Sequence, residues 1–445
     1  MAAETVVAPG AAAVGAAELP RLTVGPAPVT HAEPAIEKTH LANGIRIVTE
    51  RMPEARSVTT GFWVGAGARD EPVDLAGTSH FLEHLLFKGT ESRSARQIAE
   101  AVDAVGGEMN AFTAREHTAY YTRLPDHELG LGLDLLCDVL SAPAFRPNEI
   151  EAERQVIIEE ILMTADEPAD HVYTLLAEAL FPDHPLGREV LGTEETISAM
   201  SREDIAGFFA GHYGPANLVV AAAGNLEHDD VVAGLEQRFD GDGAPAVAVE
   251  RRRPTVAPVP LTVVRRPTEQ VHLALGWWAL DRHDPDRHVL AVANQVLGGG
   301  MASRLFQEVR EERGLAYSVY SHLSSYSDTG VLTIYAGTGP KRVGELLDVL
   351  DAEIGRLCAT DVPDAELAVA KGYLAGSLVL GLEDSGGRMN RLGSEELGRG
   401  QVLTVDEHLG RLRVVTAGDV RRVAERVLSG PRSLAAVGPV PNEIA

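Results

Sequence analysis

The chain contains an internal duplication, and this feature limits how it can fold more than any other. Three segments of its first part resemble three segments of its second part, in the same order. The pairs are 58–63 with 271–278, 107–112 with 314–319, and 149–161 with 366–378. Because self-similar segments mark repeated structural units, the sequence predicts two similarly folded halves.

Each half is predicted to mix β-strands with long helices. Strand-like patterns occur at 45–49, 57–64 and 217–223, and amphipathic helical stretches separate such segments. Strands and helices follow one another irregularly. This order favours an α+β fold with largely antiparallel sheets over a doubly wound parallel sheet.

The chain, at 445 residues, is long enough for two or more domains. We predict a flexible N-terminal tail over 1–34, a first half over 35–240, a linker over 241–259 and a second half over 260–445. The linker is rich in Pro and Gly. Its run of three arginines, 251–253, is interpreted as solvated linker rather than as a binding site.

Composition narrows the functional classes. The formal net charge of −26 disfavours nucleic acid and acidic membranes as partners. No run approaches the roughly 18 apolar residues that a membrane span needs. The opening segment lacks the basic start and compact apolar run of a secretory signal, so a cytoplasmic location is expected by default.

Cys137 and Cys358 lie in apolar segments of different halves and are predicted to be buried thiols without a disulfide.

The stretch His80-Phe81-Leu82-Glu83-His84 predicts a metal site with its own carboxylate. On a helix, His80 and His84 project from one face and can bind one metal ion. Glu83 can point at a metal-bound water, and the H-x-x-E-H order is that of the inverzincins. The alternative is a pair of surface histidines in a chance pattern, so a third ligand is needed.

That ligand is expected on a later helix, 153–163, where Glu153 and Glu160 lie two turns apart on one face. Zinc in hydrolases usually keeps three protein ligands and an open position. We predict Glu160 as the third ligand and Glu153 as a carboxylate that orients a ligand histidine. Spacing alone does not separate Glu159 from Glu160, and such glutamates can also simply solvate a helix. The predicted core face of this helix consists of Val156, Ile157, Ile161 and Leu162.

The second half lacks the corresponding ligands. Segment 292–295 reads Val-Ala-Asn-Gln where the first half has its histidines, and Glu153 and Glu160 fall on Ala370 and Ser377. One Zn²⁺ ion per chain, held by the first half, is therefore expected.

These motifs resemble the pitrilysin/insulinase zinc metallopeptidases, particularly the short branch that includes mitochondrial processing peptidase. The family has H-x-x-E-H followed by an E-R-x-x-x-x-x-E helix, which Glu153 to Glu160 match at the family's spacing from His84. The resemblance runs from about Thr39 to near the C-terminus and selects Glu160 over Glu159. It implies two similar α+β halves that face each other like a clamshell, and a homodimer.

The resemblance also implies two substrate-binding elements. Segment 106–113 resembles the family's edge strand beside the metal, where substrate adds as a further β-strand; the residues concerned are Asn110, Ala111, Phe112 and Thr113. Segment 298–317 resembles the family's motif in the second half, whose arginine and tyrosine reach the substrate near the scissile bond. Those positions are Arg310 and Tyr317, and the alternative is an ordinary loop, helix and strand.

The predicted activity is that of a zinc-dependent endopeptidase acting on peptides or unfolded polypeptides. Glu83 would be the general base on a zinc-bound water, and Tyr317, with Arg310, would donate hydrogen bonds to the oxyanion or the flanking backbone. Two other classes stay open: a non-catalytic scaffold or partner subunit with the same fold, and a metal-dependent hydrolase of another bond, such as an ester. Presequence processing is a narrower alternative within the peptidase class.

Overall fold

The computed structural model describes residues 35–239 and 250–444. The predicted tail over 1–34 and the first part of the predicted linker lie outside these residues. The division of the chain at 241–259 therefore stays a prediction, and the first described strand after it begins at Leu261.

The first sheet has six strands in the order β1-β2-β6-β3-β5-β4 among the described residues. Its strands are β1 Ile36–His40, β2 Arg46–Arg51, β3 Ser57–Val64, β4 Glu108–Thr113, β5 Thr118–Pro125 and β6 Leu218–Gly224. Neighbouring strands are antiparallel except for β2 and β6, which are parallel. This arrangement leaves β4 at one edge of the sheet.

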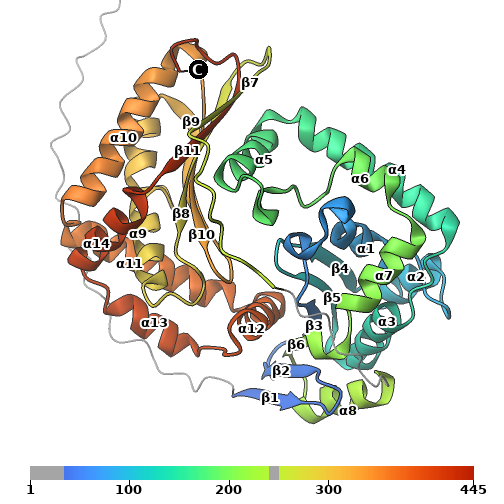
Figure 1. Ribbon diagram of the computed structural model, residues 1–445. Coiled ribbons are helices and arrows are strands. Elements are labelled where there is room, and N and C mark those ends of the chain that lie inside the picture. Colours follow the sequence, from blue (N-terminus) through green and yellow to red (C-terminus); the bar gives the residue numbers. More distant parts are fainter. Residues whose placement is uncertain (1–34, 240–249, 445) are drawn as a thin grey trace, which may run out of the picture. The chain divides into compact units, whose positions relative to one another are not determined.

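The second sheet has five strands in the order β7-β11-β8-β10-β9. They are β7 Leu261–Arg265, β8 Val271–Ala279, β9 Ala316–Ser325, β10 Gly330–Thr338 and β11 Arg432–Gly438. All neighbours are antiparallel except β7 and β11. Figure 1 shows both sheets with their helices.

The two sheets have the same topology. When β1 is set aside, the order β2-β6-β3-β5-β4 of the first sheet corresponds strand by strand to the order β7-β11-β8-β10-β9 of the second. In each sheet the first of these strands runs parallel to its neighbour, β2 to β6 and β7 to β11. The strand at the far edge, β4 or β9, follows a glycine turn. The predicted α+β class with largely antiparallel sheets is confirmed, and so is the internal duplication.

The helices follow the same repetition. Helix α4 begins at Pro147 and α11 begins at Asp364, and these two positions correspond when 149–161 is aligned with 366–378 as the sequence predicts. The α-helices are α1 Thr78–Leu86, α2 Ala95–Asp103, α3 Leu129–Ser141, α4 Pro147–Asp166, α5 Pro168–Leu180, α6 Glu194–Ala199, α7 Arg202–His212, α8 His228–Arg238, α9 Arg287–Leu297, α10 Val343–Ala359, α11 Asp364–Gly381, α12 Ser385–Arg399, α13 Val405–Arg413 and α14 Ala417–Leu428.

Local sequence sets the start of several helices. Ser94, Ser201 and Thr416 each accept a hydrogen bond from the backbone N–H three residues later, and that later side chain bonds back to the cap. Such reciprocal capping satisfies N–H groups that have no partner inside the helix. Helices α4 and α5 begin instead with proline, whose missing N–H costs nothing at that position.

Each sheet packs its main core against helices of its own half. Phe62 of β3 belongs to the same core as Phe81 of α1 and Leu136 of α3, whereas Trp277 of β8 belongs to the core that includes residues of helices α9, α10 and α14. Side chains alternate along a strand, so the opposite face of each sheet needs a second cover.

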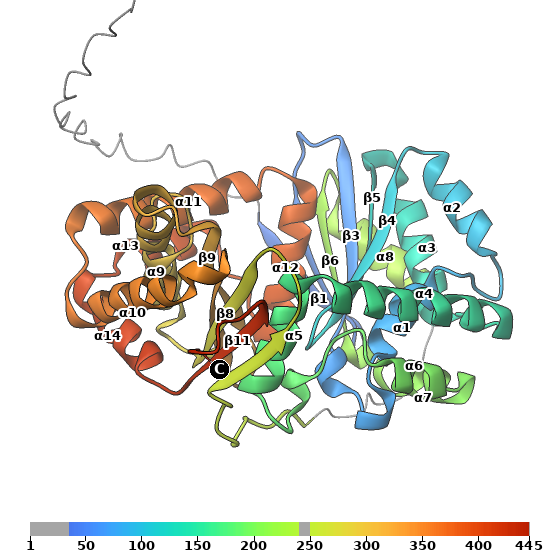
Figure 2. The same ribbon diagram turned by 90° about the horizontal axis from the view of Figure 1, so that it is seen from above.

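Two helices provide that second cover by crossing to the other half. Helix α5, from the first half, packs on β8 and β11 of the second sheet, and α12, from the second half, packs on β3 and β6 of the first (Figure 2). Trp63 of β3 is buried against Met389 and Leu392 of α12. The two halves therefore share their hydrophobic cores.

Among the described residues, no single helix is long and apolar enough to cross a membrane; α11 and α12 meet the length and composition test only together, with a bend of 108° between them.

Candidate metal centre

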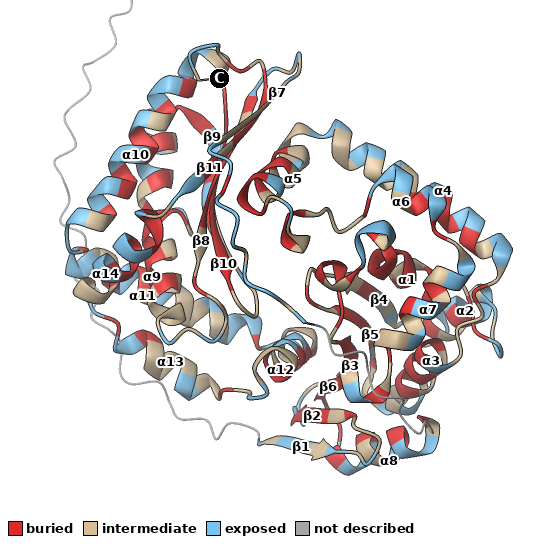
Figure 3. Cartoon of the chain, in the orientation of Figure 1, coloured by how far each residue is buried: buried red, intermediate tan, exposed pale blue. Residues whose placement is uncertain are grey.

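Helix α1 carries both predicted histidine ligands on one face. His80 and His84 are one turn apart, and their ring centroids are 4.7 Å apart. Most of the helix is buried, including Phe81, Leu82 and Leu85, whereas Glu83 is half-buried (Figure 3). This burial fixes the orientation of α1 and hence of the two imidazole rings.

A buried carboxylate holds the start of α1. Glu71 accepts hydrogen bonds from the backbone N–H groups of Gly77, at 2.7 Å, and Ser79, at 2.6 Å. Burial raises the pKa of Glu71 to about 7, although these N–H groups act in the opposite direction. Gly77 has φ of 95°, and a Cβ there would lie 2.6 Å from the carbonyl oxygen of Leu191, so the turn into α1 requires glycine. Sequence reasoning did not identify Glu71.

Helix α4 brings Glu160 to the two histidines. Its Oε2 lies 3.5 Å from Nε2 of His80 and 3.7 Å from Nε2 of His84. Ligand atoms of all three residues lie within 4.8 Å of one another. The structure thus brings together the three residues that the sequence predicts as metal ligands.

The spacing and protonation of this group fit a metal ion. The separations of Glu160 from the rings exceed those of ordinary hydrogen bonds, which are about 2.7–3.2 Å. Ligands about 2.0–2.2 Å from a tetrahedral zinc ion would be roughly 3.3–3.6 Å apart, which is close to what is found. Burial, with a smaller contribution from His84, lowers the pKa of His80 to about 4, so its ring is neutral near pH 7, as a metal ligand must be.

Glu153 fixes the second histidine. Its Oε2 lies 3.0 Å from Nδ1 of His84, while its Oε1 pairs with Nζ of Lys88 at 2.7 Å. Nδ1 of His84 donates to this carboxylate, and the other ring nitrogen, Nε2, faces Glu160 as the ligand atom. Glu153 thus contacts the ring that it is predicted to orient, and its role toward a bound metal stays a prediction. Lys88 was not predicted, although it follows His84 by four residues.

Glu83 lies on α1 next to the two histidines and faces strand β4. Its Oε2 accepts a hydrogen bond of 2.5 Å from Oγ1 of Thr113. Burial raises the pKa of Glu83, and the bond from Thr113 opposes that change. The predicted general base is therefore a partly buried carboxylate next to the predicted ligands.

Strand β4 is the edge strand that the sequence predicts. It pairs with β5 on one side and with no described strand on the other. Asn110 is exposed, Ala111 faces the core shared with α1, and the ring of Phe112 packs at 5.5 Å against Trp63 on the opposite face. The outer edge of β4 is thus open to a further strand, with the N–H of Ala111 bonded to Oδ1 of Asn110 at 2.8 Å, while the side chain of Phe112 packs inside the protein.

Arg310 and Tyr317 contact each other rather than the predicted ligands. Arg310 lies in a π-helical segment, Phe306–Glu312, and its guanidinium lies 4.2 Å from the centroid of the Tyr317 ring. Tyr317 is 74% exposed. No hydrogen bond, ion pair or ring contact joins either residue to His80, His84 or Glu160 within the described ranges, and their role toward substrate stays a prediction.

The predicted core face of the α4 helix is partly wrong. Ile157 is fully buried, but Val156 and Leu162 are exposed by 43% and 46%. Ile150 and the carboxylate-bearing Glu153 occupy the buried face instead. The helix turns its polar, metal-facing side toward α1, so apolar residues outside that contact remain at the surface.

The chain matches two models of one peptidase family. Residues 46–194 match the model described as insulinase (peptidase family M16), and residues 199–374 match the peptidase M16 inactive domain. An uncharacterized zinc protease of Streptomyces coelicolor is 46% identical over 93% of this chain and 92% of its own length. An uncharacterized zinc protease of Bacillus subtilis is 40% identical over 92% of this chain and 99% of its own length.

Solved structures show the same fold. A peptidase M16 inactive domain from Pseudomonas fluorescens aligns with a TM-score of 0.86 at 21% identity, covering 92% of this chain and 98% of that one. A protease from Helicobacter pylori aligns with a TM-score of 0.84 at 21% identity, covering 92% and 100%. A chain of complex III2 from Candida albicans aligns with a TM-score of 0.80 at 21% identity, covering 92% and 98%.

Proposed function

Because this chain belongs to the insulinase family, peptidase family M16, we propose that it is a zinc-dependent endopeptidase acting on peptides or unfolded polypeptides. One observation carries the proposal: His80, His84 and Glu160 converge on one point, and Glu83 lies on the same helix as the two histidines. Zn²⁺ is the proposed metal because two imidazoles and one carboxylate are a common ligand set of hydrolytic zinc sites.

A zinc ion bound by these three residues would polarise the substrate carbonyl and activate a water molecule. Glu83 takes the proton of the attacking water and gives it to the leaving amine. Thr113 donates to Oε2 of Glu83, and Oε1 is the oxygen proposed to carry this proton. Glu153 keeps Nε2 of His84 available by accepting from Nδ1.

Substrate binding is proposed at β4. A peptide adding to its outer edge would pair with backbone groups of Asn110 to Thr113 that β5 does not use, and such pairing favours an extended, unfolded segment over a folded protein. Arg310 and Tyr317 are proposed to contact the same substrate from the second half. A homodimer is proposed as the working form on the family resemblance alone, and a cytoplasmic location is proposed only by default.

A non-catalytic subunit of the same fold is the second candidate. The structural similarity to a chain of complex III2 and to a protein called an inactive domain favours this candidate. The complete set of His80, His84, Glu160 and Glu83 favours catalysis, because a subunit without activity has no need of these side chains.

Hydrolysis of quenched fluorogenic peptides separates the two candidates. The purified chain is assayed as isolated, after treatment with a chelator, and after addition of Zn²⁺. The peptidase proposal expects cleavage that the chelator abolishes and the metal restores. Cleavage that survives chelation, or none in any state across a broad peptide library, would support the alternatives.

A further inference from the structure

We propose that Thr113 is a positioning residue that holds the carboxylate of Glu83 in its working orientation, and that a buried ionic cluster at the end of β4 keeps Thr113 in place. This inference rests on the proposed peptidase function for its kinetic consequence. Its structural content, the orientation of one side chain, can be tested without activity.

The hydroxyl of Thr113 is aimed at Glu83. Oγ1 lies 2.5 Å from Oε2 of Glu83, whereas its other acceptor, the carbonyl oxygen of Ser79, is 3.4 Å away. Side chains alternate along β4, so Thr113 shares the face of Met109 and Ala111, which packs on α1. A threonine here therefore meets the helix that carries Glu83.

A carboxylate with one fixed oxygen has a defined orientation for the other. The terminal torsion of a glutamate has a broad, roughly two-fold preference and does not select one orientation by itself. The bond from Thr113 engages Oε2 and holds the plane of the group. Oε1 then faces one direction, and a base that is already oriented transfers a proton without first losing rotational freedom.

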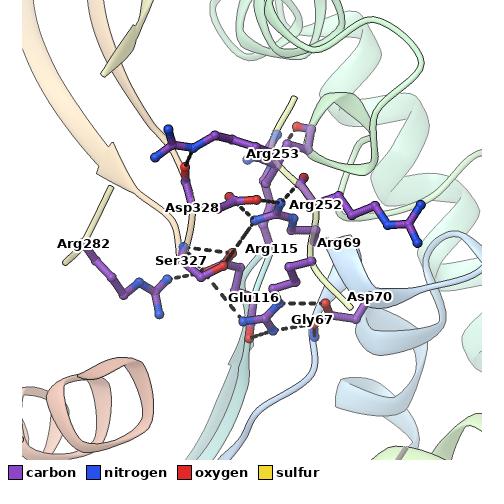
Figure 4. A network of polar contacts seen from close by, with 12 residues as sticks. Gly67, Arg69, Asp70, Arg115, Glu116, Arg252, Arg253, Arg282, Ser327 and Asp328 are labelled. Carbon is purple, nitrogen blue, oxygen red and sulfur yellow. Dashed lines mark hydrogen bonds and ion pairs between the residues drawn. The ribbon is translucent and has the colours of Figure 1, made fainter. Parts of the chain in front are cut away.

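The end of β4 is held by a buried ionic cluster, which we call the Glu116 cluster. It consists of Arg69, Asp70, Glu116, Arg251, Arg282, Ser327 and Asp328. Glu116 lies three residues after Thr113, in the turn between β4 and β5, and its side chain is 2% exposed. Its Oε1 accepts from Nη1 of Arg69 at 2.6 Å and from the hydroxyl of Ser327 at 2.8 Å (Figure 4).

Backbone contacts fasten the same turn. The N–H of Ala68 donates to the carbonyl oxygen of Ala114 at 3.2 Å, and that of Arg69 donates to Arg115 at 2.7 Å. Gly67 must be glycine, because a Cβ there would lie 2.2 Å from the carbonyl oxygen of Ala114. The turn that follows Thr113 is thus fixed to the loop that precedes α1.

The interpretation of the arginine run as solvated linker is wrong for Arg251. Its side chain is only 19% exposed and binds Asp70 at 2.7 Å. Arg252 and Arg253 do have exposed side chains. The Glu116 cluster therefore joins the linker and the second half to the strand that carries Thr113. The formal charges of its three arginines and three acidic residues cancel.

The test compares Thr113→Val, which keeps the branched shape and removes the hydroxyl, with Thr113→Ser, which keeps the hydroxyl. We expect Thr113→Val to lower kcat by roughly 10- to 100-fold, the range for a lost hydrogen bond to a charged group, with KM changed less than about twofold. Thr113→Ser should recover most of this loss. Thr122→Val, the same change in β5 on the side facing Gly132, is the matched control and should leave kcat unchanged.

Zinc content and the denaturation midpoint of each variant show whether a loss of turnover is a loss of structure. Equal kcat for wild type and Thr113→Val, or equal losses in Thr113→Val and Thr113→Ser, would overturn the proposal. If the wild type has no peptidase activity, that result counts against the proposed function alone. Crystal structures of wild type and Thr113→Val then test the positioning role. The Glu83 carboxylate should then keep one orientation in the wild type and change or split it in Thr113→Val; identical orientations would overturn the positioning role.

Discussion

At the scale of single residues, the centre is built from carboxylates that are each held differently. Glu83 is held by Thr113 and Glu153 by His84 and Lys88, whereas Glu160 approaches the two histidines and has no other ion-pair partner within the described part of the chain. The side chain of Glu160 is 36% exposed, against 7% for that of Glu153. This pattern suits Glu160 as a ligand that must move onto a metal ion, and Glu83 as a base that must keep its orientation.

Replacing Glu83 should separate metal binding from turnover. Glu83→Gln keeps the size of the side chain and removes its basicity, so zinc content should stay near one ion per chain. Turnover should fall by roughly 10²- to 10⁴-fold, the usual contribution of a positioned general base. Metal analysis and peptide kinetics on the same preparation test this, and wild-type turnover in the variant would remove Glu83 from the mechanism.

Lys88 should support metal affinity through Glu153. Lys88→Met removes the cation that pairs with Oε1 of Glu153, so that carboxylate holds His84 less firmly. We expect zinc affinity to fall roughly 10-fold or more, as it does when partners of metal-bound histidines are lost. Competition with a chelator measures the change. Lys341→Met, on the other half, is the control, and an equal effect of both variants would contradict this role.

At the scale of elements, the fold depends on two exchanged helices. Helices α5 and α12 each follow the long helix of their own half and then cover the opposite sheet. Amphipathic periodicity predicts that such helices exist but not which sheet they cover, so the exchange was not predicted. It explains why β3 carries large buried side chains, Phe62 and Trp63, on both faces.

Shortening a core residue of α12 should destabilise the first sheet. Leu392 is fully buried against that sheet, although it belongs to the second half of the sequence. Leu392→Ala should lower the free energy of unfolding by about 2–5 kcal/mol, the range for a buried leucine. Urea denaturation followed by tryptophan fluorescence, to which Trp63 contributes, measures it. A loss below about 0.5 kcal/mol would show that α12 is not packed there in solution.

At the scale of the whole molecule, sequence reasoning succeeded where the determining contacts are local. The H-x-x-E-H motif, its helix and the spacing of Glu153 and Glu160 depend on helical periodicity, and the repeated segments predicted the repeated topology. The Glu116 cluster was missed because its residues come from five separate places in the chain, and only folding brings them together. For the same reason, the arginine run could not be assigned a partner such as Asp70 from its composition.

The Glu116 cluster should contribute to the stability of the molecule through buried charge pairing. Glu116→Gln leaves the buried guanidinium of Arg69 with one partner fewer and should cost about 3–5 kcal/mol, the range for breaking a buried ion pair. Glu100→Gln is the control, because the Arg96–Glu100 pair is exposed and such pairs contribute about 0–1 kcal/mol. Equal effects of the two variants in chemical denaturation would contradict the importance of the cluster.

The most direct test of the zinc centre is anomalous diffraction at the zinc edge from crystals of the purified chain supplied with Zn²⁺. The account predicts one strong peak per chain, about 2.0–2.2 Å from Nε2 of His80, Nε2 of His84 and a carboxylate oxygen of Glu160. A peak held by other residues, or no peak at this position, would contradict it.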